Sequence, residues 1–590
     1  MLFIHWLTHR LGSCGTLILP RRPRSKERAV RGQRVVRASF ESMEERRLMS
    51  VTLAVTSSDD LAAQRGTLRW AVAKAQDGDT ILLTPAIQGA GITLSQGDLL
   101  LTQQQLTIKT VGNTPVTISG GNHSRIFELA SSANVTLINL NITGGNGLAS
   151  NGVTESHPNR GGGIVVDAGA SLAITGSSIS NNSAGFFGGA IENFGTLSLT
   201  HSTLSGNSAG NGGGGFFNLS HMILIDSVIS NNSASAGGGI YNSGGAGAFN
   251  SGTLAMSGCT ISDNSATFGG GIYNFGHIAI SEHTSLSGNS AQYGGGIYNN
   301  SSGSVIGGGM LSVSDSALSG NTALGGSGGG IYNAGTLAVS RSTLANNSAT
   351  YDGGAIANFQ GSVTVSNATL DYNSAFAGGA ISSFAFDGFG TPAVVSVSNT
   401  DISHNAANGS DDLDGLGIGG GIYNQSGDVS LNNCMLGDNH ATLSGGGIYT
   451  IVGGNFTISG GTVSDNSALS GSGGGIYNVS NMDIHDACAL SGNTAGVDGG
   501  GILNLYNLIV DHCSLSSNSA GNDGGGIYNL SFFGDTGLTL SSSNLSGNTA
   551  QFGGGIYNRS ALLFIAGSTF LNNTPDDILG LYDDGGGNNI

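Results

Sequence analysis

The residues of this sequence that are best suited to bind a ligand are tyrosines that recur beside runs of glycine. In GGGIYNN at 294–300, a tyrosine stands between an isoleucine and an asparagine. Side chains alternate between the two faces of a strand, so an inward isoleucine and asparagine leave the tyrosine facing outward. Exposed rings stack on sugars or partner surfaces, which predicts a ligand-binding stripe; the alternative is ring-on-ring packing that only stiffens the sheet. Nine tyrosines occupy this position: Tyr241, Tyr273, Tyr298, Tyr332, Tyr423, Tyr449, Tyr477, Tyr528 and Tyr557.

A second set of candidate residues is acidic. The segment NGSDDLDGLG at 408–417 carries Asp411, Asp412 and Asp414. Carboxylates on a flexible loop are suitable ligands for calcium, so this loop is a candidate calcium site; a solvated acidic loop is the alternative. The same choice applies to four residues near the C-terminus: Asp576, Asp577, Asp583 and Asp584. No other cofactor is expected.

Histidines and cysteines gather in DIHDAC at 483–488 and VDHC at 510–513. In a strand, neighbouring side chains point to opposite faces, so His512 and Cys513 cannot share a ligand or a proton. Four cysteines lie five residues before a recurrent asparagine, where other repeats have small residues: Cys259, Cys434, Cys488 and Cys513. We therefore predict a structural column of small side chains, in which Cys488 and Cys513 are marginal for a disulfide.

These residues are positioned by an internal repeat of about 25 residues, a period typical of solenoids. The apolar residue that closes the glycine run marks each copy: Ile164, Ile191, Phe216, Ile240, Ile272, Ile297, Ile331, Ile356, Ile381, Ile422, Ile448, Ile476, Ile502, Ile527 and Ile556. Within 335–358 the apolar pattern predicts three short strands per repeat. Stacked repeats of this kind give an all-β fold, a right-handed parallel β-helix made of one chain.

Two columns of asparagine should hold the coils together. A buried asparagine can bond to its neighbours above and below and can satisfy the backbone of a turn. The first column consists of the asparagine within the LSxNSA pattern: Asn182, Asn207, Asn232, Asn264, Asn289, Asn321, Asn347, Asn373, Asn405, Asn439, Asn466, Asn493, Asn518, Asn548 and Asn573. The second lies two residues after the repeat isoleucine: Asn193, Asn218, Asn242, Asn274, Asn299, Asn333, Asn358, Asn424, Asn478, Asn504, Asn529 and Asn558.

Composition and charge exclude several classes of protein. Glycine is 103 of 590 residues but proline is only 7, and 38% of residues are hydrophobic, so neither collagen nor a disordered linker fits. Residues 1–50 contain 11 Lys/Arg and 4 acids, whereas the rest contain 8 and 33, a net charge of −25. A body this acidic cannot neutralise a row of phosphates, so no nucleic-acid partner is expected.

The chain is expected to have four parts. Residues 1–50 read as a basic leader, and no segment is long and apolar enough to span a membrane. Residues 51–160 should hold a capping helix near GTLRWAVAKAQDG, begun by Thr67 and stopped near Gly78, followed by irregular coils. Residues 161–575 form the regular coils, and 576–590 an acidic, glycine-rich tail.

Several motifs resemble those of known bacterial proteins. FESMEERRLMS at 40–50 resembles the LEPR-XLL segment of large bacterial surface proteins, and GTLRWAV resembles the opening of many pectin-lyase-like parallel β-helix proteins. Phe570-Leu571-Asn572-Asn573 and the GGAI of 188–191 resemble the FxxN and GGA[I] repeats of chlamydial polymorphic outer membrane proteins. This resemblance covers about residues 160–575 and implies export, surface display and adhesion.

The sequence therefore leads to two classes of function. The first is an extracellular or cell-surface rod without enzymatic activity, which acts in adhesion or as a structural protein and contacts surface glycans or proteins of a host or neighbouring cell. The alternative is a protein that binds or degrades polysaccharide. A lyase acting on an acidic polysaccharide is disfavoured because the repeats contain only Arg341 and Arg559 and no lysine follows Lys109.

Overall fold

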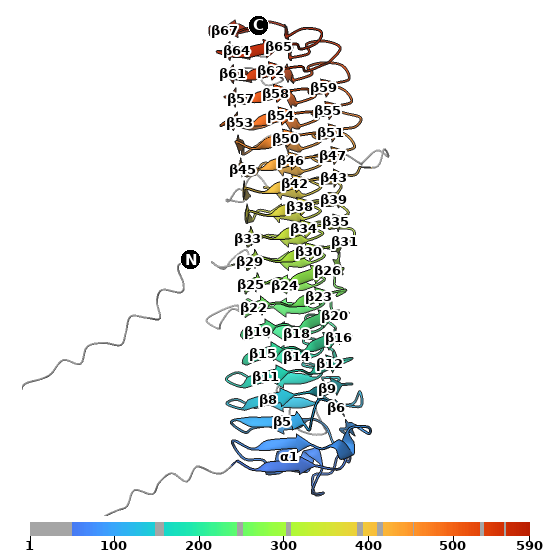
Figure 1. Ribbon diagram of the computed structural model, residues 1–590. Coiled ribbons are helices and arrows are strands. Elements are labelled where there is room, and N and C mark those ends of the chain that lie inside the picture. Colours follow the sequence, from blue (N-terminus) through green and yellow to red (C-terminus); the bar gives the residue numbers. More distant parts are fainter. Residues whose placement is uncertain are drawn as a thin grey trace, which may run out of the picture. The chain divides into compact units, whose positions relative to one another are not determined.

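A computed structural model describes residues 50–147, 158–244, 252–301, 308–385, 393–409, 417–451, 453–531, 536–559 and 562–590. The chain divides into two units, Met1–Leu48 and Met49–Ile590. The first unit, with nearly all of the LEPR-XLL-like segment, lies outside the described residues. The second unit is a stack of parallel strands, which confirms the predicted right-handed parallel β-helix (Figure 1).

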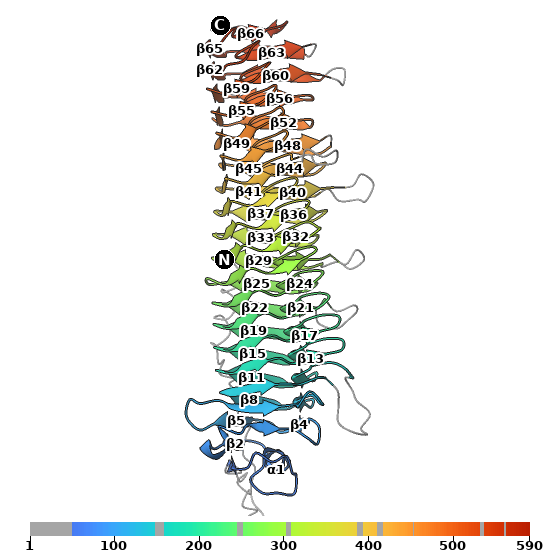
Figure 2. The same ribbon diagram turned by 90° about the vertical axis from the view of Figure 1, so that its right-hand side faces the viewer.

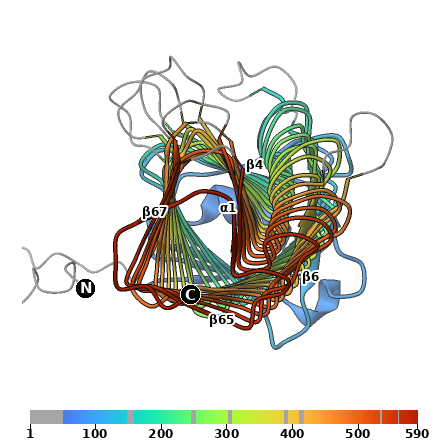
Figure 3. The same cartoon turned by 90° about the horizontal axis from the view of Figure 1, so that it is seen from above.

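The N-terminal end of the stack carries the predicted capping helix. Strand β1 (Thr52–Val55) is followed by helix α1 (Leu68–Lys74) and strand β2 (Thr80–Leu83). The Thr67 hydroxyl accepts a hydrogen bond from the Trp70 backbone N–H at 3.2 Å, which caps the first turn. Leu68, Ala71 and Val72 are buried. The helix therefore covers the open core of the first coil, as the view along the stack shows (Figure 3).

One coil of the stack illustrates the rest. Strands β33 (Thr336–Ser340), β34 (Thr343–Ala345) and β36 (Ile356–Phe359) belong to three different long parallel sheets, called here the first, second and third sheet. These are the three strands that the sequence predicts. A fourth strand, β35 (Ser348–Ala349), was not expected; it pairs with two-residue strands of neighbouring coils and directly follows an asparagine of the first column.

The third sheet places each repeat isoleucine on the next. Ile272 of β24 (Ile272–Asn274) pairs with Ile297 of β28 (Ile297–Asn299), and Ile297 pairs with Ile331 of β32 (Ile331–Asn333). The same register continues to β63 (Ile556–Arg559), and all fifteen repeat residues are completely buried. The predicted vertical file of isoleucines is therefore confirmed, and the sheet that contains it is seen face on in Figure 2.

The stack extends beyond the regular repeats at both ends. Towards the N-terminus, Phe127 of β7 (Phe127–Leu129) pairs with Leu99 of β4 (Leu99–Leu101) and with Ile164. Towards the C-terminus, β66 (Ile578–Leu579) pairs with β63 and β67 (Asp583–Asp584) pairs with β64 (Leu562–Ala566). None of the described helices is long and apolar enough to cross a membrane.

Both asparagine columns are buried hydrogen-bond ladders. In the first, the side-chain amide of each asparagine donates to the side-chain oxygen of the next, from Asn182 to Asn573, at 2.9–3.1 Å. In the second, the links run from Asn193 to Asn358 and from Asn478 to Asn558. Ser383 and Thr450 occupy the asparagine position in two coils between these runs.

Candidate functional site

The nine predicted tyrosines form a column on the outer face of the third sheet, but they are not exposed. Seven are half-buried, while Tyr423 and Tyr528 are only 6% and 4% exposed. The ring centroids of Tyr273 and Tyr298 lie 5.1 Å apart, and those of Tyr298 and Tyr332 lie 4.7 Å apart with nearly parallel planes. The stripe is therefore less exposed than expected, because most of its rings pack on a ring of the adjacent coil, as the alternative has it; ligand binding by the column stays a prediction.

Burial raises the pKa of several tyrosines of the column. Removal from water raises the pKa of Tyr298 to about 12 and raises the pKa of Tyr241, Tyr332 and Tyr449 as well. The phenols therefore remain protonated at neutral pH. They can donate hydrogen bonds and present ring faces, but they are poor bases and poor nucleophiles.

The tyrosine column is interrupted once by Leu503 and, at two successive coils, by small side chains. Tyr332 pairs with Ala357, Ala357 pairs with Ser382 of β40 (Ile381–Phe384), and Ser382 pairs with Tyr423 of β44 (Ile422–Gln425). Small side chains thus replace two consecutive rings. A hollow of about 460 Å³ lies at this gap. Its lining residues are Phe268, Tyr293, Tyr298, Ser327, Tyr332, Asp352, Ala357, Phe359, Phe384, Ala385 and Gln425. We call this feature the ring hollow.

Rings from three positions of the repeat surround the ring hollow. Tyr293, four residues before its repeat isoleucine, meets Tyr332 edge to face, with centroids 5.9 Å apart. Phe359, three residues after its repeat isoleucine, lies 6.2 Å from Tyr332. Phe384 occupies the same position one coil later and lies 5.4 Å from Tyr423. Rings from outside the tyrosine column therefore lie on both sides of the gap in it.

Asp352 is the one ionisable carboxylate among the described residues that line the ring hollow. The Ser327 hydroxyl of the preceding coil donates a hydrogen bond to it at 3.0 Å. Burial raises the pKa of Asp352 to about 6, and only the Ser327 hydrogen bond opposes this rise. The pKa values of Tyr332 and Tyr423 are raised, mainly by burial. Neighbouring phenols and the charge of Asp352 raise them further. The carboxylate therefore acts on the hydroxyls at both sides of the gap.

Sequence reasoning did not single out Asp352. It lies four residues before its repeat isoleucine, at a position where other coils have residues as different as Phe268, Ala377 and Ile418, so it shows no recurrent pattern. A usable signal was nevertheless present in the sequence. Between Tyr241 and Tyr557, Ala357 and Ser382 are the two small residues at the tyrosine position, and they stand in successive repeats. Two small side chains in a row within a stacked column of rings indicate a place where the column is open.

The other predicted sites are not assembled in the described part of the chain. Asp411, Asp412 and Asp414 lie outside the described residues, so the calcium prediction stays a prediction. Near the C-terminus, Asp577 accepts a hydrogen bond from Asn573 at 2.7 Å, and Asp584 accepts one from Asn588 at 2.7 Å. Among the described residues no group of three or more histidine, cysteine, aspartate or glutamate side chains is placed to hold a metal ion.

The cysteines confirm the predicted column of small side chains. Cys259, Cys434, Cys488 and Cys513 are free thiols and are buried. Burial raises the pKa of Cys488 to about 12, so its thiol is unreactive at neutral pH. The adjacent His512 is exposed and bonds to Asp511 at 2.8 Å, so His512 and Cys513 face opposite sides as predicted. The reason is not strand alternation, because both residues lie at a corner between two strands, where His512 has φ 53°.

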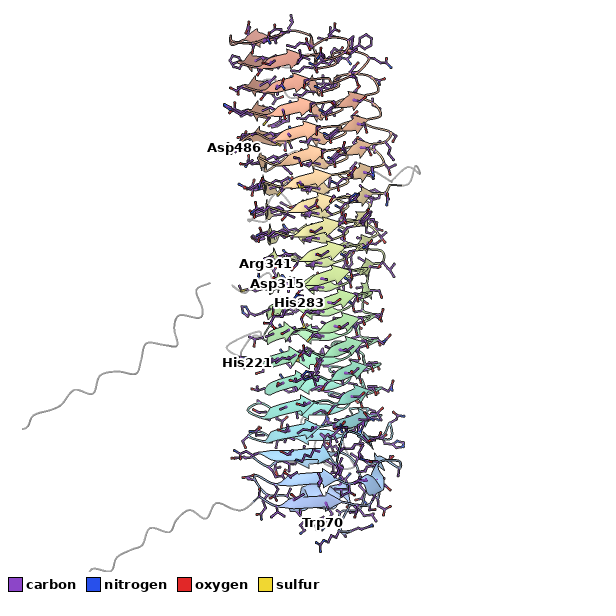
Figure 4. The ribbon with its side chains drawn as sticks, in the orientation of Figure 1. Trp70, His221, His283, Asp315, Arg341 and Asp486 are labelled. Carbon is purple, nitrogen blue, oxygen red and sulfur yellow. The ribbon has the colours of Figure 1, made fainter. Side chains whose placement is uncertain are left out.

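Charged side chains on the outer surface form hydrogen bonds between neighbouring coils. Arg341 forms two hydrogen bonds with Asp315 of the preceding coil, at 2.8 and 2.6 Å, and Figure 4 labels both residues on one side of the stack. Asp486 binds the Ser459 hydroxyl of the preceding coil at 2.8 Å. Such contacts are exposed and contribute little to stability. They provide no concave site, which distinguishes them from the ring hollow.

The comparisons with known proteins do not assign a family. No protein-family model and no curated protein matches this chain. Similar solved structures include the catalytic unit of a thermostable GH87 α-1,3-glucanase from Streptomyces thermodiastaticus strain HF3-3, with 11% identity, a TM-score of 0.23 and coverage of 83% of this chain and 67% of that one. Another is the PL6 family alginate lyase AlyGC, with 11% identity, a TM-score of 0.27 and coverage of 91% and 100%. Likenesses this remote carry no argument about function.

Proposed function

We propose that the protein is a non-catalytic binding rod that acts outside the cell, in adhesion or as a structural surface protein. The observation that carries this proposal is the ring hollow. Elsewhere the polar groups of the described coils mainly bond to adjacent coils, whereas the ring hollow is a concave surface lined by aromatic rings and a carboxylate. Concave sites lined by rings with a few polar groups are typical of ligand binding. Its partners would be surface glycans or proteins of a host or neighbouring cell.

The arrangement of the ring hollow favours binding over catalysis. Hydrolysis of a glycosidic bond commonly uses two carboxyl groups within about 5–10 Å of each other. Asp352 is the one carboxyl group in the described lining, and burial raises the pKa of the Tyr298 and Tyr332 phenols, so these two remain protonated. A single carboxylate among rings can orient a ligand but lacks the usual partner for acid–base catalysis.

A second candidate function is the binding or degradation of polysaccharide. The same observation favours it in part, because ring faces stack on the apolar faces of sugars and a carboxylate accepts hydrogen bonds from sugar hydroxyls. The two candidates differ in a measurable way. A glycan-binding rod retains its ligand unchanged, whereas an enzyme releases shorter products.

Glycan-array binding, together with an assay for released sugar, tests these candidates. The wild-type protein is compared with a Tyr298→Ser, Tyr332→Ser double variant and with Tyr372→Ser, whose ring is 57% exposed and lies outside the column. We expect wild type and Tyr372→Ser to bind and the double variant to lose binding, while circular dichroism remains unchanged. Release of sugar by the wild type would refute the non-catalytic proposal. Equal binding by the wild type and both variants would refute the role of the column.

A further inference from the structure

The ring hollow holds a negative charge that no described cation neutralises. The Ser327 hydroxyl donates a hydrogen bond to the Asp352 carboxylate, and no basic residue is among the described lining. Charged groups that are removed from water are costly unless they are paired. A half-buried carboxylate beside an open hollow is therefore suited to a ligand that brings a positive charge.

We propose that the ring hollow binds a small organic ammonium group, with Asp352 as its counter-ion and the faces of Tyr332 and Phe359 as its walls. This inference rests on the proposed binding function and names its ligand chemistry. The ammonium group would come from a quaternary ammonium headgroup, as in choline, or from the protonated amine of an amino sugar. Both present a compact cation with apolar surface around it.

The rings favour a cation over a neutral group of the same shape. The face of an aromatic ring is electrostatically negative and attracts a cation within about 6 Å of its centre. Tyr293 meets Tyr332 at 77°, with centroids 5.9 Å apart, and Phe359 lies 6.2 Å from Tyr332, so rings in more than one orientation line the hollow. The volume of about 460 Å³ lies within the roughly 300–1,000 Å³ usual for sites that take small molecules.

The long-range field of the chain acts in the same direction. Residues 51–590 carry 8 Lys/Arg and 33 Asp/Glu, so they repel anions and attract cations. An acidic polysaccharide would have to approach against this field and would meet Asp352 at the site. The charge distribution therefore selects a cationic ligand over an anionic one.

Ligand binding should depend on pH through Asp352. Burial raises its pKa to about 6, so the carboxylate is charged at pH 7.5 and protonated at pH 5. The titratable groups that face it are the phenols of Tyr293, Tyr298, Tyr332 and Tyr423. Affinity for a quaternary ammonium, which does not titrate, should therefore fall as the pH decreases through 6.

Calorimetric titration with matched probes tests the proposal on the full chain. Choline is compared with 3,3-dimethylbutan-1-ol, which has the same shape without the charge, and glucosamine is compared with N-acetylglucosamine, which lacks the cation. We expect choline or glucosamine to bind at least tenfold more tightly than its neutral counterpart. Tighter binding of choline would identify a quaternary ammonium headgroup as the source of the ammonium group, and tighter binding of glucosamine would identify an amino sugar. Equal affinity for charged and neutral probes, or no binding of either cation, would overturn the proposal.

Three variants locate the binding to the ring hollow. Asp352→Asn removes the charge with little change in size, and Ala357→Tyr continues the tyrosine column into the gap; each should weaken cation binding about tenfold or more. Asp263→Asn is the control, because Asp263 is exposed at a corner where Asn231 and Asn346 stand in other coils. Unchanged binding in Asp352→Asn would refute the proposal even if Ala357→Tyr fails to fold. Failure of the cation probes with intact glycan-array binding would leave the proposed function standing.

Discussion

At the scale of single residues, the first asparagine column satisfies its own polar groups almost completely. The Asn347 side-chain amide donates to the Leu318 carbonyl at 2.9 Å and to the Asn373 side-chain oxygen at 3.0 Å. Its own side-chain oxygen accepts from the backbone and side-chain amides of Asn321 at 3.1 and 3.0 Å. Each asparagine thus joins three coils, and its loss affects partners on both sides.

We predict that Asn347→Ala lowers the free energy of unfolding by about 3 kcal/mol, because it leaves buried donors of Asn321 and the Leu318 carbonyl without partners. The measurement is chemical denaturation followed by circular dichroism. Asn346→Gly is the control: Asn346 is exposed with φ 56°, a conformation that glycine adopts freely, so we expect a change within about 0.5 kcal/mol. Equal effects of the two substitutions would contradict the prediction.

A buried carboxyl group gives the fold a dependence on pH. Glu192 is completely buried and contacts Arg160 at 2.9 Å, and its second carboxyl oxygen has no hydrogen-bond partner among the described residues. Burial raises its pKa from 4.5 to about 7 against the opposing effect of Arg160. The folded chain therefore holds this proton more tightly than the unfolded chain does.

We predict that the contribution of Glu192 to stability is complete below about pH 4.5 and is lost as the pH rises through 7. Denaturation midpoints measured from pH 5 to 8.5 should decrease in the wild type and should decrease less in Glu192→Gln, which keeps the shape without the titration. Asp226→Asn, an exposed site, serves as the control and should follow the wild type. A steeper decrease in Glu192→Gln than in the wild type would contradict the prediction.

At the scale of the strand and its corner, the three glycine positions before the repeat isoleucine have three different roles. The first has positive φ in every coil, for example Gly328 at 75° and Gly353 at 62°. The second lies against the backbone of the next coil: a Cβ on Gly329 would be 2.5 Å from the carbonyl oxygens of Gly354 and Ser348. The third is alanine in three coils, Ala190, Ala355 and Ala380, so a methyl group is tolerated there.

We predict that Gly329→Ala destabilises the fold by about 3 kcal/mol or more, whereas Gly330→Ala costs less than about 1 kcal/mol. A Cβ on Gly330 would also lie close to backbone, 2.6 Å from the Ala355 carbonyl oxygen, but it would meet one carbonyl rather than two, and three other coils accommodate an alanine at this position. Thermal unfolding of the two single variants under the same conditions decides this. The opposite order of stability would show that the corner is not limited by contact between coils.

The sequence predicts which side chains of a strand point inward or outward better than it predicts which residues of other coils contact them. Alternation along a strand places Ile297 and Asn299 inside and Tyr298 outside, and the structure confirms this. It does not reveal that Tyr273 and Tyr332 cover Tyr298, because the covering residues belong to other coils and their ring angles depend on packing. For the same reason Asp352 and Phe359 look unrelated in the sequence, although the fold places both beside the gap at Ala357.

At the scale of the whole second unit, stability should be nearly a sum over neighbouring coils, because each coil pairs only with the one before and the one after it. The Ile476 coil and the Ile527 coil both contact the Ile502 coil between them. Each of these three coils provides an asparagine to both ladders. A coil can therefore be removed if its neighbours are brought together in the same register.

We predict that deletion of residues 502–526, one repeat of 25 residues that joins Gly501 to Ile527, leaves a folded β-helix with one coil fewer. Asn493 would then bond to Asn548, which replaces Asn518 at the same place, and Tyr477 would lie beside Tyr528, which replaces Leu503. Deletion of residues 502–521 is the control, since it removes a length that is not one repeat and shifts the later strands out of register. Circular dichroism, cooperative denaturation and limited proteolysis should show a native-like product for the first deletion and an unfolded or aggregated one for the second. Loss of folding in both deletions would mean that coils depend on more than their nearest neighbours.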